Sequence, residues 1–210
     1  MSSNGGVGAG DAVAAQLTAI LARLGELADA PLDDCEVAGA ARVDRIAVLE
    51  QMRAALAAAQ HTEMVAFART RVDEQAELVT AGRLDPEKLG RGIADEIALA
   101  AHVSPWQGSK RLTIASALAG DLPETRELLA AGRISERLAE TVVAQTTHLD
   151  AEQRRLVDKA LAGAGLETLG FRQAEAAVKK VAYETDKAGY TNRSRKARQD
   201  RRVTLRPAPD

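Results

Sequence analysis

Residues 92–120 contain the strongest fold signal in the sequence, because helix boundaries can be placed there from the residues alone. Ser104 is followed by Pro105 and then by Gln107, which predicts a capping box at the start of a helix. The apolar residues that recur at helical spacing are Ile93, Ile97, Ala100 and Ala101 before this start, and Leu112, Ala115 and Leu118 after it. The segment therefore predicts two helices joined by a short turn, which is the outline of a helix-turn-helix.

This outline has two interpretations. In a DNA-binding helix-turn-helix the second helix enters the major groove, and its outward side chains contact bases. On that interpretation the outward residues are Gln107, Ser109, Lys110 and Thr113. The segment departs from the usual pattern, because the turn holds His102 instead of a small residue, and Gly108 and Arg111 stand where apolar residues are usual. The alternative is an αα-hairpin that only packs within a helical domain, since such a hairpin shows the same caps and spacing.

Signals that end and begin helices recur along the rest of the chain. The similar segments AGRLDPEKL and AGRISERL each hold a glycine, Gly82 or Gly132, that can end a helix in a left-handed turn. The residue that can cap the following helix is Asp85 in the first segment and Ser135 in the second. Further predicted N-caps are Asp11, Asp121 in a capping box with Glu124, Asp150 in a capping box with Gln153, and Thr168.

Composition supports an all-α fold. Alanine, leucine, glutamate and arginine are abundant, and all four favour helix. Aromatic residues make up only 2% of the chain, so the core must consist of aliphatic side chains, with helices approaching closely over alanine. We expect a multi-helix bundle with a helix-turn-helix-like hairpin and a long second helix over about residues 34–80.

The predicted second helix carries an apolar stripe. Its residues follow each other at steps of three or four: Val43, Ile46, Leu49, Met52 and Leu56. A helix of this length usually docks against several others or pairs with a second chain. The stripe therefore makes a homodimer through the long helix one of the partners to consider.

The sequence predicts three regions. Residues 1–10 are rich in glycine, serine and asparagine, which predicts a disordered tail. Residues 11–190 form the helical domain, which includes the helix-turn-helix-like unit at 92–120. Residues 191–210 are a basic linker that leads into Val203, Thr204 and Leu205, a short strand without a partner. We interpret that ending as the start of a C-terminal module that is missing from this chain.

The charge is near neutral overall but unevenly distributed. The net charge is −2, yet residues 171–206 hold eleven Lys and Arg against four Asp and Glu. If DNA is a partner, phosphate contacts are expected from the basic tail. Its candidate residues are Arg193, Arg195, Lys196, Arg198, Arg201 and Arg202.

The sequence predicts no catalytic residue, no metal site and no cofactor. His61, His102 and His148 lie far apart, with no cysteine or carboxylate at metal-ligand spacing, and no nucleophile or phosphate-loop motif is present. Cys35 is the single cysteine, which excludes an intrachain disulfide and favours a reducing compartment. Signal-peptide features and membrane-length apolar runs are absent from the sequence, so we expect a cytoplasmic protein without membrane contact.

The second half of the chain resembles a known family. The segments that carry the resemblance are VSPWQGSKRL (residues 103–112), DLP (121–123), AAGRIS (130–135) and DRRV (200–203). They are similar to the actinobacterial 13E12 repeat family, also called domain of unknown function 222. The similarity covers residues 84–210 well and the preceding helices loosely.

The resemblance implies a context for function. In that family the helical domain commonly precedes an HNH endonuclease module, which binds a metal and cuts DNA. No position of this sequence matches the HNH motif, so this chain is expected not to be an enzyme, while its full-length parent would be an HNH endonuclease associated with mobile elements. The expected function is a non-catalytic accessory domain that positions the nuclease on DNA. The alternative is a structural or dimerisation module without nucleic-acid contact.

Overall fold

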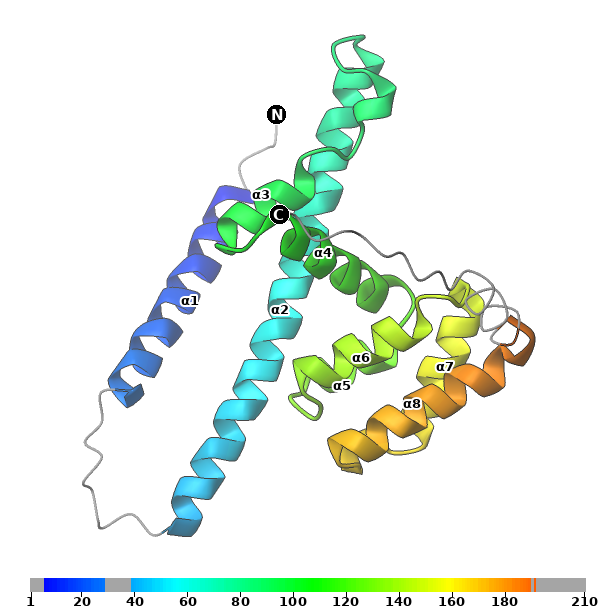
Figure 1. The fold of residues 1–210 in the computed structure, drawn as a ribbon. Coiled ribbons are helices and arrows are strands. Elements are labelled where there is room, and N and C mark those ends of the chain that lie inside the picture. Colours follow the sequence, from blue (N-terminus) through cyan, green and yellow to red (C-terminus); the bar gives the residue numbers. More distant parts are fainter. Residues whose placement is uncertain (1–5, 29–38, 190, 192–210) are drawn as a thin grey trace, which may run out of the picture. The chain divides into compact units, whose positions relative to one another are not determined.

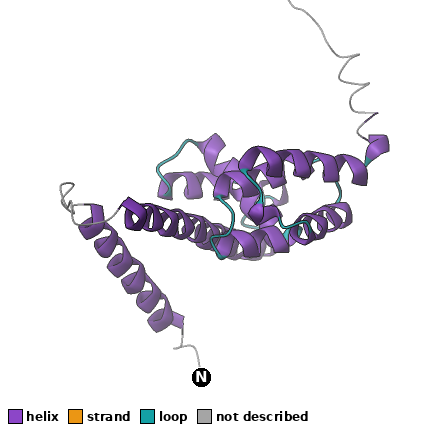
Figure 2. Ribbon diagram, turned by 90° about the horizontal axis from the view of Figure 1, so that it is seen from below, coloured by secondary structure: helices purple, strands orange, loops and turns teal. Residues whose placement is uncertain are grey.

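The computed structural model describes residues 6–28, 39–189 and 191, and it confirms the predicted all-α fold with a long second helix (Figures 1 and 2). No strand occurs within these described ranges. The predicted strand at residues 203–205 lies outside them. The α-helices are α1 (Gly6–Ala28), α2 (Gly39–Thr80), α3 (Ile93–Ala100), α4 (Pro105–Gly120), α5 (Pro123–Ala130), α6 (Glu136–Thr146), α7 (Ala151–Gly163) and α8 (Phe171–Thr185). Single turns of 3-10 helix occur at Pro86–Lys88 and Leu166–Thr168.

The chain divides into two compact units, Met1–Arg45 and Ile46–Asp210. In the first unit, α1 begins at Gly6, five residues before the predicted cap at Asp11. No proline interrupts residues 6–10, so helical hydrogen bonds can continue through the glycines there. None of the helices in the described residues combines the length and the apolar character that a bilayer crossing requires.

In the second unit, α2 packs through small side chains. Its buried residues are Ala54, Ala57, Ala58, His61 and Met64. Ala54 and Ala58 belong to the main hydrophobic core, and Met64 lies in a smaller cluster with Ile93 of α3. The larger side chains of the predicted stripe are exposed: Ile46 by 61%, Leu49 by 43%, Met52 by 41% and Leu56 by 55%. The alanine face makes the contact because it lets neighbouring helices approach closely.

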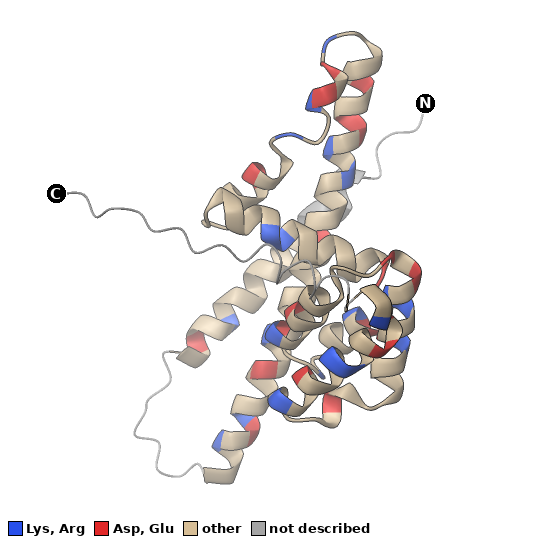
Figure 3. Cartoon of the chain, turned by 45° about the vertical axis from the view of Figure 1, so that its right-hand side comes forward, with Lys and Arg blue, Asp and Glu red and all other residues tan. Residues whose placement is uncertain are grey.

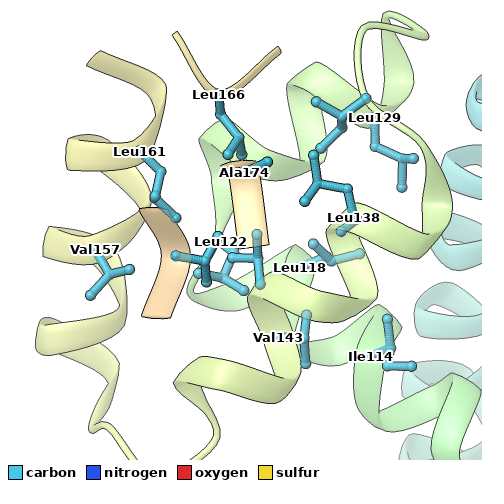
Figure 4. Close-up of a cluster of buried hydrophobic side chains, with 14 of the residues drawn as sticks. Ile114, Leu118, Leu122, Leu129, Leu138, Val143, Val157, Leu161, Leu166 and Ala174 are labelled. Atoms are coloured by element: carbon cyan, nitrogen blue, oxygen red, sulfur yellow. The ribbon is translucent and has the colours of Figure 1, made fainter. Parts of the chain in front are cut away.

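The main core lies among α4, α5, α6, α7 and α8, and its side chains are aliphatic, as the scarcity of aromatic residues predicts (Figure 4). The largest of its fully buried side chains are Leu118, Leu122, Leu129, Val142, Val157, Leu161, Leu166 and Val178. Phe171 is only partly buried, at the edge of this cluster. Burying leucine and valine side chains of this kind contributes roughly 1.5–3 kcal/mol each, so this core is the main source of stability.

The predicted local signals at helix ends are confirmed in most places. Gly82 and Gly132 both adopt a φ of 68°, and the following residue in each case bonds back across the turn, with Arg83 N donating to Leu78 O at 2.8 Å and Arg133 N to Leu128 O at 2.9 Å. The side chains of Asp85 and Ser135 accept the predicted capping bonds. Asp150 and Gln153 form the predicted capping box.

Besides Asp11, which lies inside α1, two further predicted caps are wrong. Asp121 does not cap α5, because its carboxylate instead forms an ion pair with Arg154 at 3.1 Å. Thr168 does not cap α8, because it ends a 3-10 turn and the N-cap residue is Gly170. The cap of α5 comes from α7: the Asp158 carboxylate accepts hydrogen bonds from Glu124 N at 2.7 Å and Thr125 N at 3.0 Å. Asp158 is only 1% exposed, and these two hydrogen bonds supply partners for its buried carboxylate oxygens.

Candidate nucleic-acid interface

The α3–α4 hairpin has the predicted boundaries and the predicted cap. Ser104 Oγ accepts a hydrogen bond from Gln107 N at 3.3 Å, and Ser104 N donates to Gln107 Oε1 at 3.3 Å. His102 has a φ of 52°, in the left-handed region that favours glycine. The turn therefore has the backbone conformation for which a glycine would be the usual residue, and His102 adopts it at a cost in backbone strain.

Gly108, the second departure from the usual pattern, is explained by the contact between α3 and α4. A Cβ at this position would lie 2.7 Å from Ala98 Cβ and 3.1 Å from Ala98 Cα, and it would also overlap the carbonyl oxygen of Ala94. Only glycine lets the two helices pack at this distance. The same contact buries Ala98, whereas Ala100, which was predicted on the inner face of α3, is exposed and lines a pocket with Met64 and Phe67 of α2.

The four residues of α4 predicted to face outward are all exposed. Three of them also have a local role. Gln107 completes the capping box, and Thr113 Oγ1 donates to the Ser109 carbonyl at 2.9 Å. Lys110 Nζ lies 3.0 Å from Glu140 Oε2 of α6. This outward face of α4 is therefore ordered by bonds within the domain.

A groove of about 540 Å³ runs between α4 and α6 and gathers three of these residues. From α4 it is lined by Trp106, Ser109, Lys110 and Thr113, and from α6 by Arg137, Glu140 and Thr141. We call this surface the α4–α6 groove. Gln107 does not line it, so the structure separates one predicted residue from the other three.

Trp106 and Arg137 are the two most informative of the groove residues that the sequence interpretation missed. Trp106 is 72% exposed, although indole is large and apolar and is usually well buried. Arg137 packs its guanidinium over the Phe171 ring, 4.3 Å from the ring centroid, and this contact holds its charge at the groove. The signal available for Trp106 was its place directly after Pro105, on the first turn of a capped helix and outside the apolar spacing.

The electrostatics of the groove are mixed. Lys110 and Arg137 are opposed by the single carboxylate of Glu140 among its lining residues. Figure 3 shows the same interspersion of basic and acidic residues over the described helices. The six basic tail residues predicted to contact phosphate, from Arg193 to Arg202, lie outside the described residues.

Two buried titratable groups lie elsewhere in the second unit. Burial lowers the pKa of His61 below its usual value, although Glu136 and Glu140 oppose this effect. Burial raises the pKa of Asp158, while the hydrogen bonds from Thr125 and from Glu124 N act in the opposite direction. Within the part of the chain that the structure describes, no three His, Cys, Asp or Glu side chains are grouped so that they could hold a metal ion.

Comparison with known proteins gives one match. The family model described as domain of unknown function (DUF222) matches residues 44–210, which is most of the chain and nearly all of α2. No curated protein and no solved structure matches the sequence.

Proposed function

The chain belongs to the DUF222 family, and we propose that its helical domain is a non-catalytic module that positions a larger protein on DNA. The observation that carries this proposal is the α4–α6 groove. On the helix that follows the turn of a helix-turn-helix-like hairpin, it presents an exposed tryptophan, a lysine and two hydroxyl groups, and the facing helix α6 adds Arg137 and the hydroxyl of Thr141. Aromatic faces, cations and hydroxyl donors are the groups that proteins use to contact bases and phosphates.

The wider context of the proposal comes from the family resemblance. We propose that an HNH endonuclease module follows this domain in the parent protein and that the catalysis belongs to that module. The lone cysteine favours a cytoplasmic location for such a protein. The basic residues of the tail, between the helical domain and the proposed nuclease module, would then add contacts to DNA phosphates.

The proposal is tested by titrating a labelled DNA duplex with the chain at several salt concentrations. Lys110→Gln should weaken binding about three- to tenfold at low salt and reduce the log–log salt slope by about one, because one phosphate contact is lost. Glu140→Gln should tighten binding about threefold, because it removes the opposing carboxylate and releases Lys110.

The matched control is Lys179→Gln. Lys179 on α8 is ion-paired to Glu175 at 2.7 Å, as Lys110 is to Glu140, but it lies outside the groove. It should change DNA affinity by less than twofold. Equal effects of the two lysine substitutions would assign binding to overall charge and not to the groove. Undetectable duplex binding by the wild-type chain at low salt would refute the proposal.

The exposed stripe of α2 favours a second candidate function, dimerisation through a second copy of this chain. Leu49, Met52 and Leu56 recur at heptad spacing on the side of α2 away from its buried alanines. In an antiparallel pair that places Met52 opposite Leu56 of the second copy, Arg45 stands opposite Glu63. Because the pair is symmetric, this favourable charge contact forms twice.

Sedimentation equilibrium separates the two functions. If the domain is a dimerisation module, the wild-type chain should form a concentration-dependent dimer. Leu56→Glu should raise the dimer dissociation constant at least tenfold. Ala47→Glu, at an exposed position outside the stripe, should have little effect on that constant. A chain that stays monomeric at high micromolar concentration would exclude this alternative.

A further inference from the structure

A cavity of about 240 Å³ lies against α2, α4 and α5, away from the α4–α6 groove. Its polar lining consists of His61, Thr62 and Arg69 from α2 and Arg126 from α5, and α4 contributes alanine and leucine side chains. We propose that this cavity binds a phosphate group. The proposal stands independently of DNA positioning, because no residue is shared between the two surfaces.

The charge of the lining is the first reason. Two guanidinium groups line the cavity and no carboxylate does, in a chain whose net charge is −2. Neither Arg69 nor Arg126 forms an ion pair with any residue that the structure describes. The α4–α6 groove differs in this respect because the carboxylate of Glu140 lines it. A further cavity also differs, because Glu50 and Glu136 line it. Arginine forks match the oxygen geometry of phosphate and bind it in bidentate fashion.

His61 is the second reason. Its side chain is 8% exposed, and its Nδ1 atom is buried without a hydrogen-bond partner among the described protein groups. Its Nε2 atom lies 4.0 Å from Glu136 Oε1, beyond hydrogen-bond distance. A buried polar atom that is left unpaired costs stability, so such atoms are rare and usually have a role. Since Nδ1 itself is shielded, a donor to a bound phosphate oxygen would have to be an N–H on Nε2, and the neutral imidazole adds no negative charge to the lining.

The size of the cavity fits the proposed ligand. Since a water molecule occupies about 30 Å³ in the liquid, the cavity has room for a tetrahedral anion and a few waters. Thr62, at the same cavity, carries a hydroxyl group that already donates to the Ala58 carbonyl at 3.0 Å and can still accept a hydrogen bond. The phosphate could belong to a free ion or small ester, or to the backbone of DNA, and the chemistry recognised is the same in both cases.

The test is a calorimetric titration of the full chain with inorganic phosphate, against chloride at equal ionic strength. The wild-type chain should bind phosphate at one saturable site. The double variant Arg69→Gln/Arg126→Gln should weaken binding at least tenfold, and its fold should persist because both side chains are exposed. The control Arg172→Gln changes an exposed arginine of α8 that does not line the cavity, so it should alter the affinity less than twofold. The imidazole NMR signals of His61 should shift on phosphate addition.

A parallel titration with a DNA duplex identifies the source of the phosphate. If the double variant loses inorganic phosphate and DNA affinity together, and phosphate competes with DNA, the cavity takes a backbone phosphate. If only inorganic phosphate binding is lost, the cavity takes a free phosphate or a small ester. Absence of phosphate binding by the wild-type chain, or equal binding by the double variant, would overturn the proposal whatever the result with Lys110→Gln.

Discussion

Asp158→Ala should destabilise the domain by about 3 kcal/mol, although Asp158 does not line the α4–α6 groove. The substitution removes the acceptor of hydrogen bonds from Glu124 N, Thr125 N and Thr125 Oγ1. Loss of a helix cap costs about 1 kcal/mol, and each buried donor left without a partner adds roughly 1 kcal/mol or more. The free energy of unfolding from urea denaturation measures this loss directly.

Asp121→Ala is the matched control for that experiment. Asp121 is the residue that the local sequence pattern marks as the cap of α5, but in the structure it pairs with Arg154 at 3.1 Å and is partly exposed. A partly exposed ion pair contributes about 1 kcal/mol or less. If Asp121→Ala proved more destabilising than Asp158→Ala, the cap would come from the local residue, and the assignment to α7 would be wrong.

Gly108→Ala is expected to destabilise the domain by about 2 kcal/mol, even though alanine is a better helix former than glycine. The added methyl group would lie 2.7 Å from Ala98 Cβ and overlap the Ala94 carbonyl, so α3 must move away from α4. Inserting a methyl group into a packed contact costs about 1–3 kcal/mol, and here the obstacle is helix backbone, which cannot rotate aside.

Gly120→Ala supplies the comparison within the same helix. Gly120 is the last residue of α4, and nothing lies within 4 Å of where its Cβ would be. It should be neutral or stabilise the domain by up to about 1 kcal/mol through helix propensity. The free energies of unfolding of the two glycine variants should therefore differ by about 2–3 kcal/mol in urea denaturation. Similar stabilities would mean that α3 and α4 are not in close contact at Gly108.

The features that the sequence predicted well are those set by neighbouring residues. The Ser104–Gln107 capping box and the left-handed turns at Gly82 and Gly132 depend on hydrogen bonds within a few residues, so their patterns are visible in the chain. The cap of α5 could not be predicted in this way, because Asp158 and Thr125 are 33 residues apart. The all-α class follows from many such local signals together.

Which face of a helix is buried was harder to predict. The pattern of large apolar side chains in α2 singles out the stripe that includes Leu49 and Leu56. In the structure, α2 is instead buried through Ala54, Ala57 and Ala58. A prediction from apolar spacing favours the most hydrophobic side chains. The contact between two helices depends instead on how closely their backbones can approach, which small side chains allow. The groove has a similar explanation: Lys110 and Glu140 are 30 residues apart, and only the packing of α4 beside α6 brings them together.

Intrinsic fluorescence tests the proposed function most directly, because Trp106 is the single tryptophan of the chain and lies 72% exposed in the α4–α6 groove. If this groove is the DNA interface, adding a duplex at low salt should change Trp106 emission along the same saturating curve as the anisotropy of labelled DNA. Raising the salt should reverse both signals together. An anisotropy curve that saturates while Trp106 emission stays constant would place DNA elsewhere on the chain and contradict the account.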